Sequence, residues 1–238
     1  MTQILATYID HMGSDLSVVN AARVSFGKKS EWEEQVHPSG DYADNVLSER
    51  DSKLIRYLAK HKHISPFGHA FASFHVKAPI FVARQLVKHK FLRWNEVSRR
   101  YVDDEPEFYV PDVWRGRSAD KKQGSLDEAV DISKERLWYD PYDGLISIGD
   151  ATINVQNVIK DVYKSLLEQG VAPEQARMVL PQSTMTEWYW SGSLDAFASM
   201  CQLRCKPDTQ YESRLVANQI SEKMLELFPV SWAALMET

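Results

Sequence analysis

The segment 84–101 most constrains what this chain can fold into, because it combines dense positive charge with large apolar side chains. It holds six Lys or Arg residues and one Glu, a local charge of +5, in a chain of 238 residues with a formal net charge of −5. The remaining residues therefore carry −10 between them. Five large apolar residues separate the charges: Phe91, Leu92, Trp94, Val97 and Tyr101. A purely solvated basic face would not need them, so the segment indicates an anionic partner, most commonly a phosphate.

Composition places the chain among ordinary globular proteins, with 44% apolar and 26% charged residues. We expect a single domain with a sizeable core spanning residues 1–238, with a mobile loop at 27–46. The longest apolar run, at 78–83, is too short to span a bilayer, and the first residues lack the basic start of a secretory signal. We therefore expect a cytoplasmic protein that does not bind membranes.

Cysteine and histidine usage argues against a metal site. Cys201 and Cys205 lie four residues apart without a second pair, which suits a reducing compartment and two small core residues better than zinc. His61, His63 and His69 fit no common zinc spacing, and no thiol or carboxylate joins them. We predict that the protein holds no metal.

Hydrophobic periodicity predicts a mixture of strands and helices. Ser48 should cap a helix, with Asp51 three residues on, and Gly170 should follow the end of another. A third helix should bury the apolar stripe from Val155 to Leu166. Strands are expected at 4–12, 70–78, 108–111 and 183–189; helices at 17–24, 48–61, 80–88, twice within 125–170, at 173–180, 194–205 and 209–227.

Arg204 stands out in the helix expected at 194–205. It lies three residues after Cys201 and seven after Phe197, so it projects along the apolar stripe of that helix. A guanidinium in such a place needs a partner or a ligand.

The basic segment resembles the signature of the flavin-dependent thymidylate synthases. That family carries Arg-His-Arg, seven residues and Ser, and this chain has Lys88-His89-Lys90, seven residues and Ser98. Asn95-Glu96 precedes the serine and Arg100-Tyr101 follows it, as in the family. The run at 75–85 is also closely similar, and the resemblance extends from about residue 15 to residue 220.

The resemblance implies an α+β fold with a small, mostly antiparallel sheet packed against several helices. It also implies FAD as the cofactor. The positions that match the family's flavin ligands are His63, Ser65, Lys88, His89, Lys90, Glu96, Ser193, Asp195 and Ser199. The chain departs from the family at several of them, with Lys at 88 and 90, and Ser, Asp and Ser at 193, 195 and 199. It also has Gly68 where the family usually has Glu.

The resemblance further implies dUMP as the substrate, with Arg204 as the catalytic residue that activates the pyrimidine. Ser98 and Arg100 would hold the phosphate together with Gln85, while Arg177 and Arg204 would meet the ring. The full set of matching dUMP positions is Gln85, Lys88, Glu96, Val97, Ser98, Arg99, Arg100, Arg177 and Arg204.

The implied reaction is reductive methylation of dUMP to dTMP, with methylene-tetrahydrofolate as carbon donor and NADPH as reductant of FAD. The chain has no Gly-x-Gly-x-x-Gly motif for a Rossmann site. Neither cysteine has an obvious activating base, so no enzyme thiolate is expected. The family assembles as a homotetramer whose sites draw on several subunits.

Two other classes of function are compatible with parts of the sequence. Basic residues interleaved with aromatic ones would suit a module that binds single-stranded nucleic acid, although the net charge of −5 argues against it. A flavoprotein oxidoreductase without methyl transfer is the other alternative.

Overall fold

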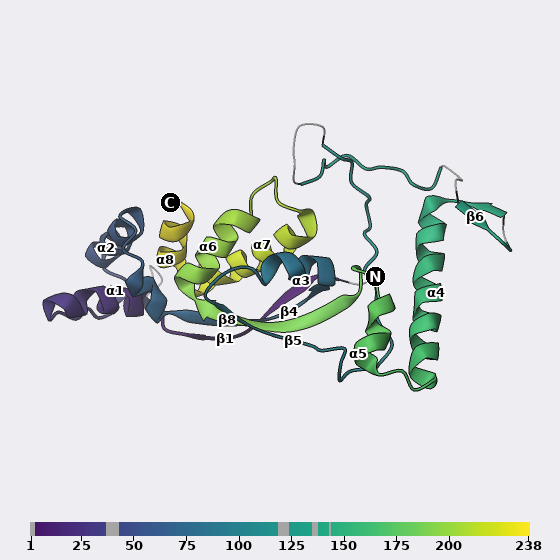
Figure 1. The fold of residues 1–238 in the computed structure, drawn as a ribbon. Helices are drawn as coiled ribbons and strands as arrows, with labels where there is room; N and C mark the ends of the chain where they lie inside the picture. Colours follow the sequence, from purple (N-terminus) through teal and green to yellow (C-terminus); the bar gives the residue numbers. More distant parts are fainter. Residues whose placement is uncertain (1–2, 37–42, 119–123, 135–137, 143) are drawn as a thin grey trace.

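The fold is built around one antiparallel sheet of four strands, ordered β1-β4-β8-β5. The computed structural model describes residues 3–36, 43–118, 124–134, 138–142 and 144–238. The strands are β1 (Leu5–Met12), β4 (Phe71–Pro79), β8 (Met185–Ser193) and β5 (Leu92–Glu96). Figure 1 shows the sheet at the centre of the molecule with helices gathered on one of its faces. The predicted fold class is confirmed.

Along the two central strands, buried and partly exposed side chains alternate, as expected for a sheet that is covered on one face. Along β4, Phe74, Val76 and Ala78 are buried, whereas the residues between them are partly exposed. In the β4–β8 pair, Phe74 lies opposite Trp190 and Val76 opposite Trp188. These inward side chains form the floor of the core.

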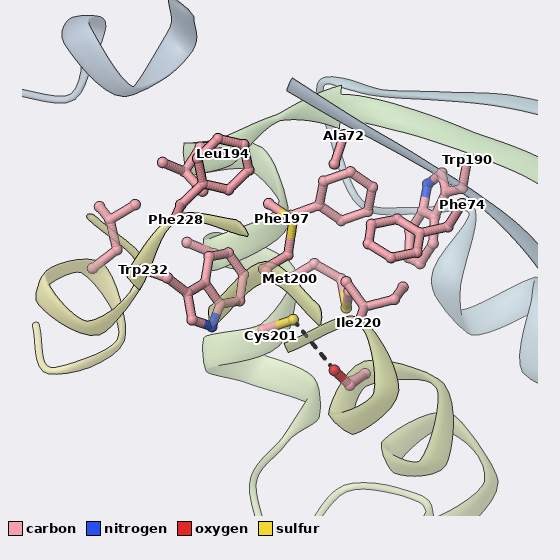
Figure 2. Close-up of a cluster of buried hydrophobic side chains, with 14 of the residues drawn as sticks. Ala72, Phe74, Trp190, Leu194, Phe197, Met200, Cys201, Ile220, Phe228 and Trp232 are labelled. Carbon is pink, nitrogen blue, oxygen red and sulfur yellow. Dashed lines mark hydrogen bonds between the residues drawn. The ribbon is translucent and has the colours of Figure 1, made fainter. Parts of the chain in front are cut away.

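Helices α6 (Leu194–Arg204) and α7 (Tyr211–Leu227) supply most of the cover over this floor. The ring of Phe197 on α6 lies 5.4 Å from that of Phe74 and 5.6 Å from that of Trp190, both edge-on. Figure 2 shows this aromatic cluster continuing through Met200 and Cys201 to Trp232 of α8 (Pro229–Met236). At that end of the core, α8 packs against α2 (Glu49–Lys60).

The remaining elements are short or peripheral. They are α1 (Asp15–Arg23), η1 (Val24–Phe26), β2 (Glu33–Val36), β3 (Ala43–Val46), η2 (Ser65–His69), α3 (Ile80–Leu86), β6 (Trp138–Asp140), β7 (Gly144–Ile146), α4 (Ile148–Glu168), α5 (Pro173–Ala176) and η3 (Arg177–Val179). None of the helices in the described ranges combines the length and the apolar character needed to cross a membrane.

Local signals in the sequence placed most helix ends correctly. The hydroxyl of Ser48 accepts a hydrogen bond of 3.1 Å from the backbone N–H of Asp51, as a capping residue should. Gly170 has a φ of 82° just beyond the end of α4, a conformation that favours glycine. Both predictions are confirmed.

Several short strands differ from the sequence predictions. The basic segment contains β5, which was not expected, and the strand predicted at 108–111 is reduced to a single bridge between Phe108 and Thr184. The first of two helices predicted within 125–170 is wrong, because β6 and β7 form a hairpin there. Such short strands depend on partners elsewhere in the fold rather than on local propensity.

The loop predicted at 27–46 contains the paired strands β2 and β3, so it is more regular than expected. Residues 37–42 lie outside the described residues, and the mobility of the loop stays a prediction. The sequence also missed α8, which follows α7 after a break at Phe228.

Helix α4 forms where predicted, but its apolar stripe is not buried as expected. Val155, Val158 and Val162 are exposed, with 59% of Val158 accessible, and Tyr163 is the member of the predicted stripe that is buried. Figure 1 shows the reason, since α4 stands beyond one end of the sheet and contacts α5 and η3 instead of the core.

Candidate functional site

A cavity of about 780 Å³ opens between α3, the start of α7, the segment 109–115 and α4. Three of the predicted site residues line it: Gln85 and Lys88 near the end of α3, and Arg204 at the last residue of α6. The β4–β8 register starts α3 and α6 at opposite ends of the sheet, and the hydrogen bond from Arg204 to Gln85 joins them at the cavity, although more than a hundred residues separate the two helices in the chain. The cavity is therefore the candidate active site.

Arg204 is held by one side chain from α3 and by another from the residues just after α3. Its Nε donates to Nε2 of His89 at 2.9 Å, and its Nη1 donates to Oε1 of Gln85 at 3.4 Å. Burial lowers the pKa of Arg204 from its usual value without discharging it. In the described part of the chain its hydrogen-bond partners are both neutral, so the positive charge stays available to a ligand.

Gln85 extends this network to α7. Its Oε1 also accepts a hydrogen bond of 3.1 Å from Oγ of Ser213, and its Nε2 donates to Oε1 of Gln210. Ser213 is fully buried, whereas Gln85 and Gln210 line the cavity. Arg204, Gln85 and Gln210 thus form a connected polar wall.

His89 must be neutral to accept from Arg204 at Nε2, which places its proton on Nδ1. Burial and the nearby charge of Arg204 lower the pKa of His89 to about 4. The histidine therefore orients Arg204 as an uncharged acceptor throughout the neutral pH range.

Sequence reasoning missed an aromatic and cationic part of the same cavity. The guanidinium carbon of Arg115 lies 3.3 Å from the ring centroid of Tyr211, and Trp114 and Tyr109 line the wall beside it. Nε of Arg115 is buried with no hydrogen-bond partner in the described residues. Burial, followed by the charges of Glu212 and Asp112, raises the pKa of Tyr109 to about 12. In the sequence, the pair Trp114-Arg115 in an otherwise charged loop is the one signal that could have indicated this part of the cavity.

The second half of the basic segment lies apart from the cavity. Arg100 donates from Nε to Oγ of Ser98 at 3.1 Å, and Arg99 pairs with Asp104 at 2.8 Å. Within the described ranges, neither Ser98 nor Arg100 lines the cavity that contains Gln85 and Arg204. One chain therefore does not assemble the whole predicted dUMP site.

Three further residues predicted to meet dUMP also lie outside this cavity. The carboxylate of Glu96 accepts from Thr186 at 2.9 Å and from Trp94 at 3.0 Å, and the backbone N–H of Val97 donates to the carbonyl of Glu187. Arg177 is exposed and donates to the backbone carbonyl of Glu174 at 3.3 Å. Arg177 is not among the described residues that line the Arg204 cavity, and its contact with the pyrimidine ring stays a prediction.

The predicted flavin ligands fall into two groups at opposite ends of α6. Lys88, His89 and Lys90 lie at its C-terminal end, where His89 contacts Arg204. The second group includes Ser193 and Asp195 at its N-terminal end, Ser65 in η2, which packs against α6, and His63 just before η2. Ser199 lies midway along α6, and Glu96 lies on β5. The 11 residues of α6 place its two ends about 16 Å apart.

At the N-terminal end, the backbone N–H of Leu194 donates to the carbonyl of Ala70 at 2.8 Å, which fixes α6 against η2. Oδ1 of Asp195 is buried there without a hydrogen-bond partner in the described residues, and it lies near Gly68. His63, Ser65 and Ser199 are exposed. The rings of His61 and His63 lie near Tyr57, at 4.3 and 6.1 Å, which is a packing role.

Comparison with known proteins gives consistent matches over almost the whole chain. A family model described as "Thymidylate synthase complementing protein" matches residues 7–230. A protein named "Flavin-dependent thymidylate synthase" from Thermus thermophilus is 38% identical over 229 residues, covering 96% of this chain and 74% of that protein. A protein of the same name from Thermosipho africanus is 37% identical, covering 96% and 89%.

A solved structure is also similar. The crystal structure of a UMP/dUMP methylase, PolB from Streptomyces cacaoi, bound with 5-Br dUMP, superposes with a TM-score of 0.73 at 31% identity. It covers 99% of this chain, and this chain covers 96% of it.

Proposed function

Because the chain belongs to the thymidylate synthase complementing protein family, we propose that it is a flavin-dependent thymidylate synthase. It converts dUMP to dTMP, with methylene-tetrahydrofolate as carbon donor and NADPH as the reductant of bound FAD. The observation that carries this proposal is Arg204, a desolvated and permanently charged group that lines a cavity of about 780 Å³ with only neutral partners in the described residues. The catalytic domain spans residues 1–238.

Arg204 would contribute most as the reaction proceeds. Methylation at C5 of a uracil places negative charge on the ring carbonyls and N3, and a fixed guanidinium stabilises that charge. His89 and Gln85 hold the guanidinium in place, so little reorganisation accompanies the reaction. Lys88 adds a second positive charge to the same wall.

The residues at the two ends of α6 suit FAD. Lys88 and Lys90 are exposed cations that fit the diphosphate, and Oδ1 of Asp195, which has no hydrogen-bond partner among the described residues, is an acceptor for a hydroxyl or amino group. Ser193 and Ser199 add polar groups on α6, Ser65 and His63 add others in and before η2, and Glu96 lies on β5. Bound flavin, once reduced, supplies the hydride for the reaction.

The site is completed by another copy of the chain, in a homotetramer. Ser98, Arg99 and Arg100 lie apart from the Arg204 cavity in one chain, although the proposed reaction needs a phosphate anchor. The exposed valines of α4 support such an assembly, because a contiguous apolar face normally finds cover. A second chain would bring its Ser98 and Arg100 to the cavity, and Arg177 would meet dUMP in the same way.

The proposal is tested by incubating purified protein with FAD, NADPH, methylene-tetrahydrofolate and either dUMP or UMP. Formation of dTMP from dUMP is expected. Including UMP tests a ribonucleotide activity like the one named for PolB. Oxidation of NADPH without any methylated nucleotide would indicate a flavoprotein oxidoreductase. A protein without a flavin spectrum that binds single-stranded nucleic acid would indicate the remaining alternative.

A further inference from the structure

Ser213 is a fully buried polar residue that faces the cavity wall from behind. It lies on α7, next to the buried residues Val216 and Ala217, yet its hydroxyl reaches α3 and donates to Oε1 of Gln85 at 3.1 Å. A buried hydroxyl requires such a partner, because burial without one is costly. The partner here is a residue that lines the cavity.

Chemistry fixes which end of the Gln85 carboxamide faces Ser213. Arg204 can only donate hydrogen bonds, so the atom of Gln85 that lies 3.4 Å from its Nη1 must be the oxygen. A rotated carboxamide would place its NH₂ against the guanidinium, donor against donor. Ser213 and Arg204 therefore occupy both acceptor sites of Oε1.

The NH₂ group of Gln85 is then turned the other way. One of its N–H groups donates to Oε1 of Gln210, which leaves the second for the cavity. Arg204 likewise keeps three of its five N–H donors after the bonds to His89 and Gln85. Together these two side chains present only donors to a bound molecule.

We propose that Ser213 is a positioning residue that locks the Gln85 carboxamide with its NH₂ toward the cavity, so that the Gln85–Arg204 corner binds oxygen acceptors of the nucleotide. This inference rests on the proposed function, and it names the chemistry of the substrate atom at this corner. Two groups of dUMP offer that chemistry: the ring carbonyl edge, which cytosine replaces in part with an amino group, and the phosphate.

The experiment measures equilibrium binding of dUMP, dCMP and deoxyuridine to the FAD-loaded protein and to Ser213→Ala. Alanine favours helix and fits the space, so the variant should fold. We expect about threefold weaker dUMP binding. Unchanged dCMP binding would assign the acceptor to the ring carbonyl. An equal loss for dCMP, with deoxyuridine unchanged, would assign it to the phosphate. Either pattern supports the lock, as does an equal loss for all three ligands, which would assign the acceptor to the ring carbonyl O2 that they share. No loss of dUMP binding overturns it.

A double-mutant cycle tests whether Ser213 acts through Gln85. In a Gln85→Ala background, Ser213→Ala should weaken dUMP binding no further, whereas additive losses would overturn the proposal. Ser221→Ala is the matched control, because Ser221 is another α7 serine whose hydroxyl accepts a hydrogen bond of 3.0 Å from Trp232; this variant should bind dUMP like the wild type. Wild-type protein that binds FAD but no dUMP would overturn the proposed function and the lock together.

Discussion

Nε of Arg204 lies 2.9 Å from Nε2 of His89, which joins residues 115 positions apart. The bond links the end of α6 to the basic segment after α3, the two regions in which the sequence concentrates its chemistry. It also means that the residue proposed to activate the pyrimidine is oriented by the central histidine of the Lys-His-Lys signature.

Replacing Arg204 with Ala should lower the rate of methyl transfer by about 100-fold, because the charge that stabilises the anionic ring is lost. Lys at this position should rescue poorly, since it cannot donate to His89 and Gln85 in the same planar arrangement. The measurement is single-turnover oxidation of reduced flavin with dUMP and methylene-tetrahydrofolate present. Retained FAD absorbance is the control for folding. Oxidation at the wild-type rate in Arg204→Ala would reduce Arg204 to a structural residue.

Stability should fall as the pH is lowered from 6.5 to about 4, because the pKa of His89 is lowered to about 4 in the folded protein. In this window the unfolded chain binds a proton that folded His89 does not, which favours unfolding. Above 6.5 both states are neutral, and below about 4 both are charged, so the slope is confined to the window. The variant His89→Gln keeps an acceptor for Arg204, and its free energy of unfolding should depend less on pH in this window. Denaturant unfolding at pH 4.5, 5.5 and 7 in both proteins measures the difference.

The double variant Cys201→Ala, Cys205→Ala should retain methyl transfer at close to the wild-type rate. Burial raises the pKa of Cys201, whose Sγ lies 3.6 Å from the carbonyl of Ala217 inside the core (Figure 2), so it is not an available thiolate. A stability cost of about 1 kcal/mol is expected from the lost packing. A folded double variant that makes no dTMP would point to thiolate catalysis instead.

Asp51→Ala should destabilise the protein by about 3 kcal/mol, because it leaves the guanidinium of Arg23 largely buried without its partner. Arg23 donates from Nε to Asp51 at 2.9 Å, and the hydroxyl of Ser30 donates to the same oxygen at 3.1 Å. Asp51 therefore ties α1 and the start of the 27–46 segment to α2. Lys53→Ala, which breaks an exposed pair with Glu49, should change the free energy of unfolding by at most about 0.5 kcal/mol. Equal effects of the two substitutions would contradict the assignment.

How far the sequence predicted the structure depended on whether the signal was local. Ser48 and Gly170 marked helix ends correctly because a cap or a left-handed residue acts within a few positions. The apolar spacing around Arg204 indicated a charge at the edge of the core that needs a partner, and the structure supplies His89 and Gln85.

Signals that depend on distant partners were missed. Nothing near Leu92 shows that it will pair with Gly192, and nothing near Arg115 shows that it will stack on Tyr211. The sequence predicts that the apolar stripe of α4 is buried in the core, but the stripe is exposed. Hydrophobic periodicity indicates that a helix has an apolar face, and it does not indicate what covers that face.

The separation of Ser98 and Arg100 from the Arg204 cavity within one chain has a genetic consequence. If each site takes Arg204 from one chain and the phosphate anchor from another, two different inactive variants can complement each other in mixed assemblies. Refolding inactive Arg204→Ala with inactive Arg100→Ala at equal amounts should then restore both native partners in about a quarter of the sites. A cell that carries both mutant alleles would then keep part of the methyl-transfer activity. An assembly in which each site is built from one chain would recover no activity on mixing.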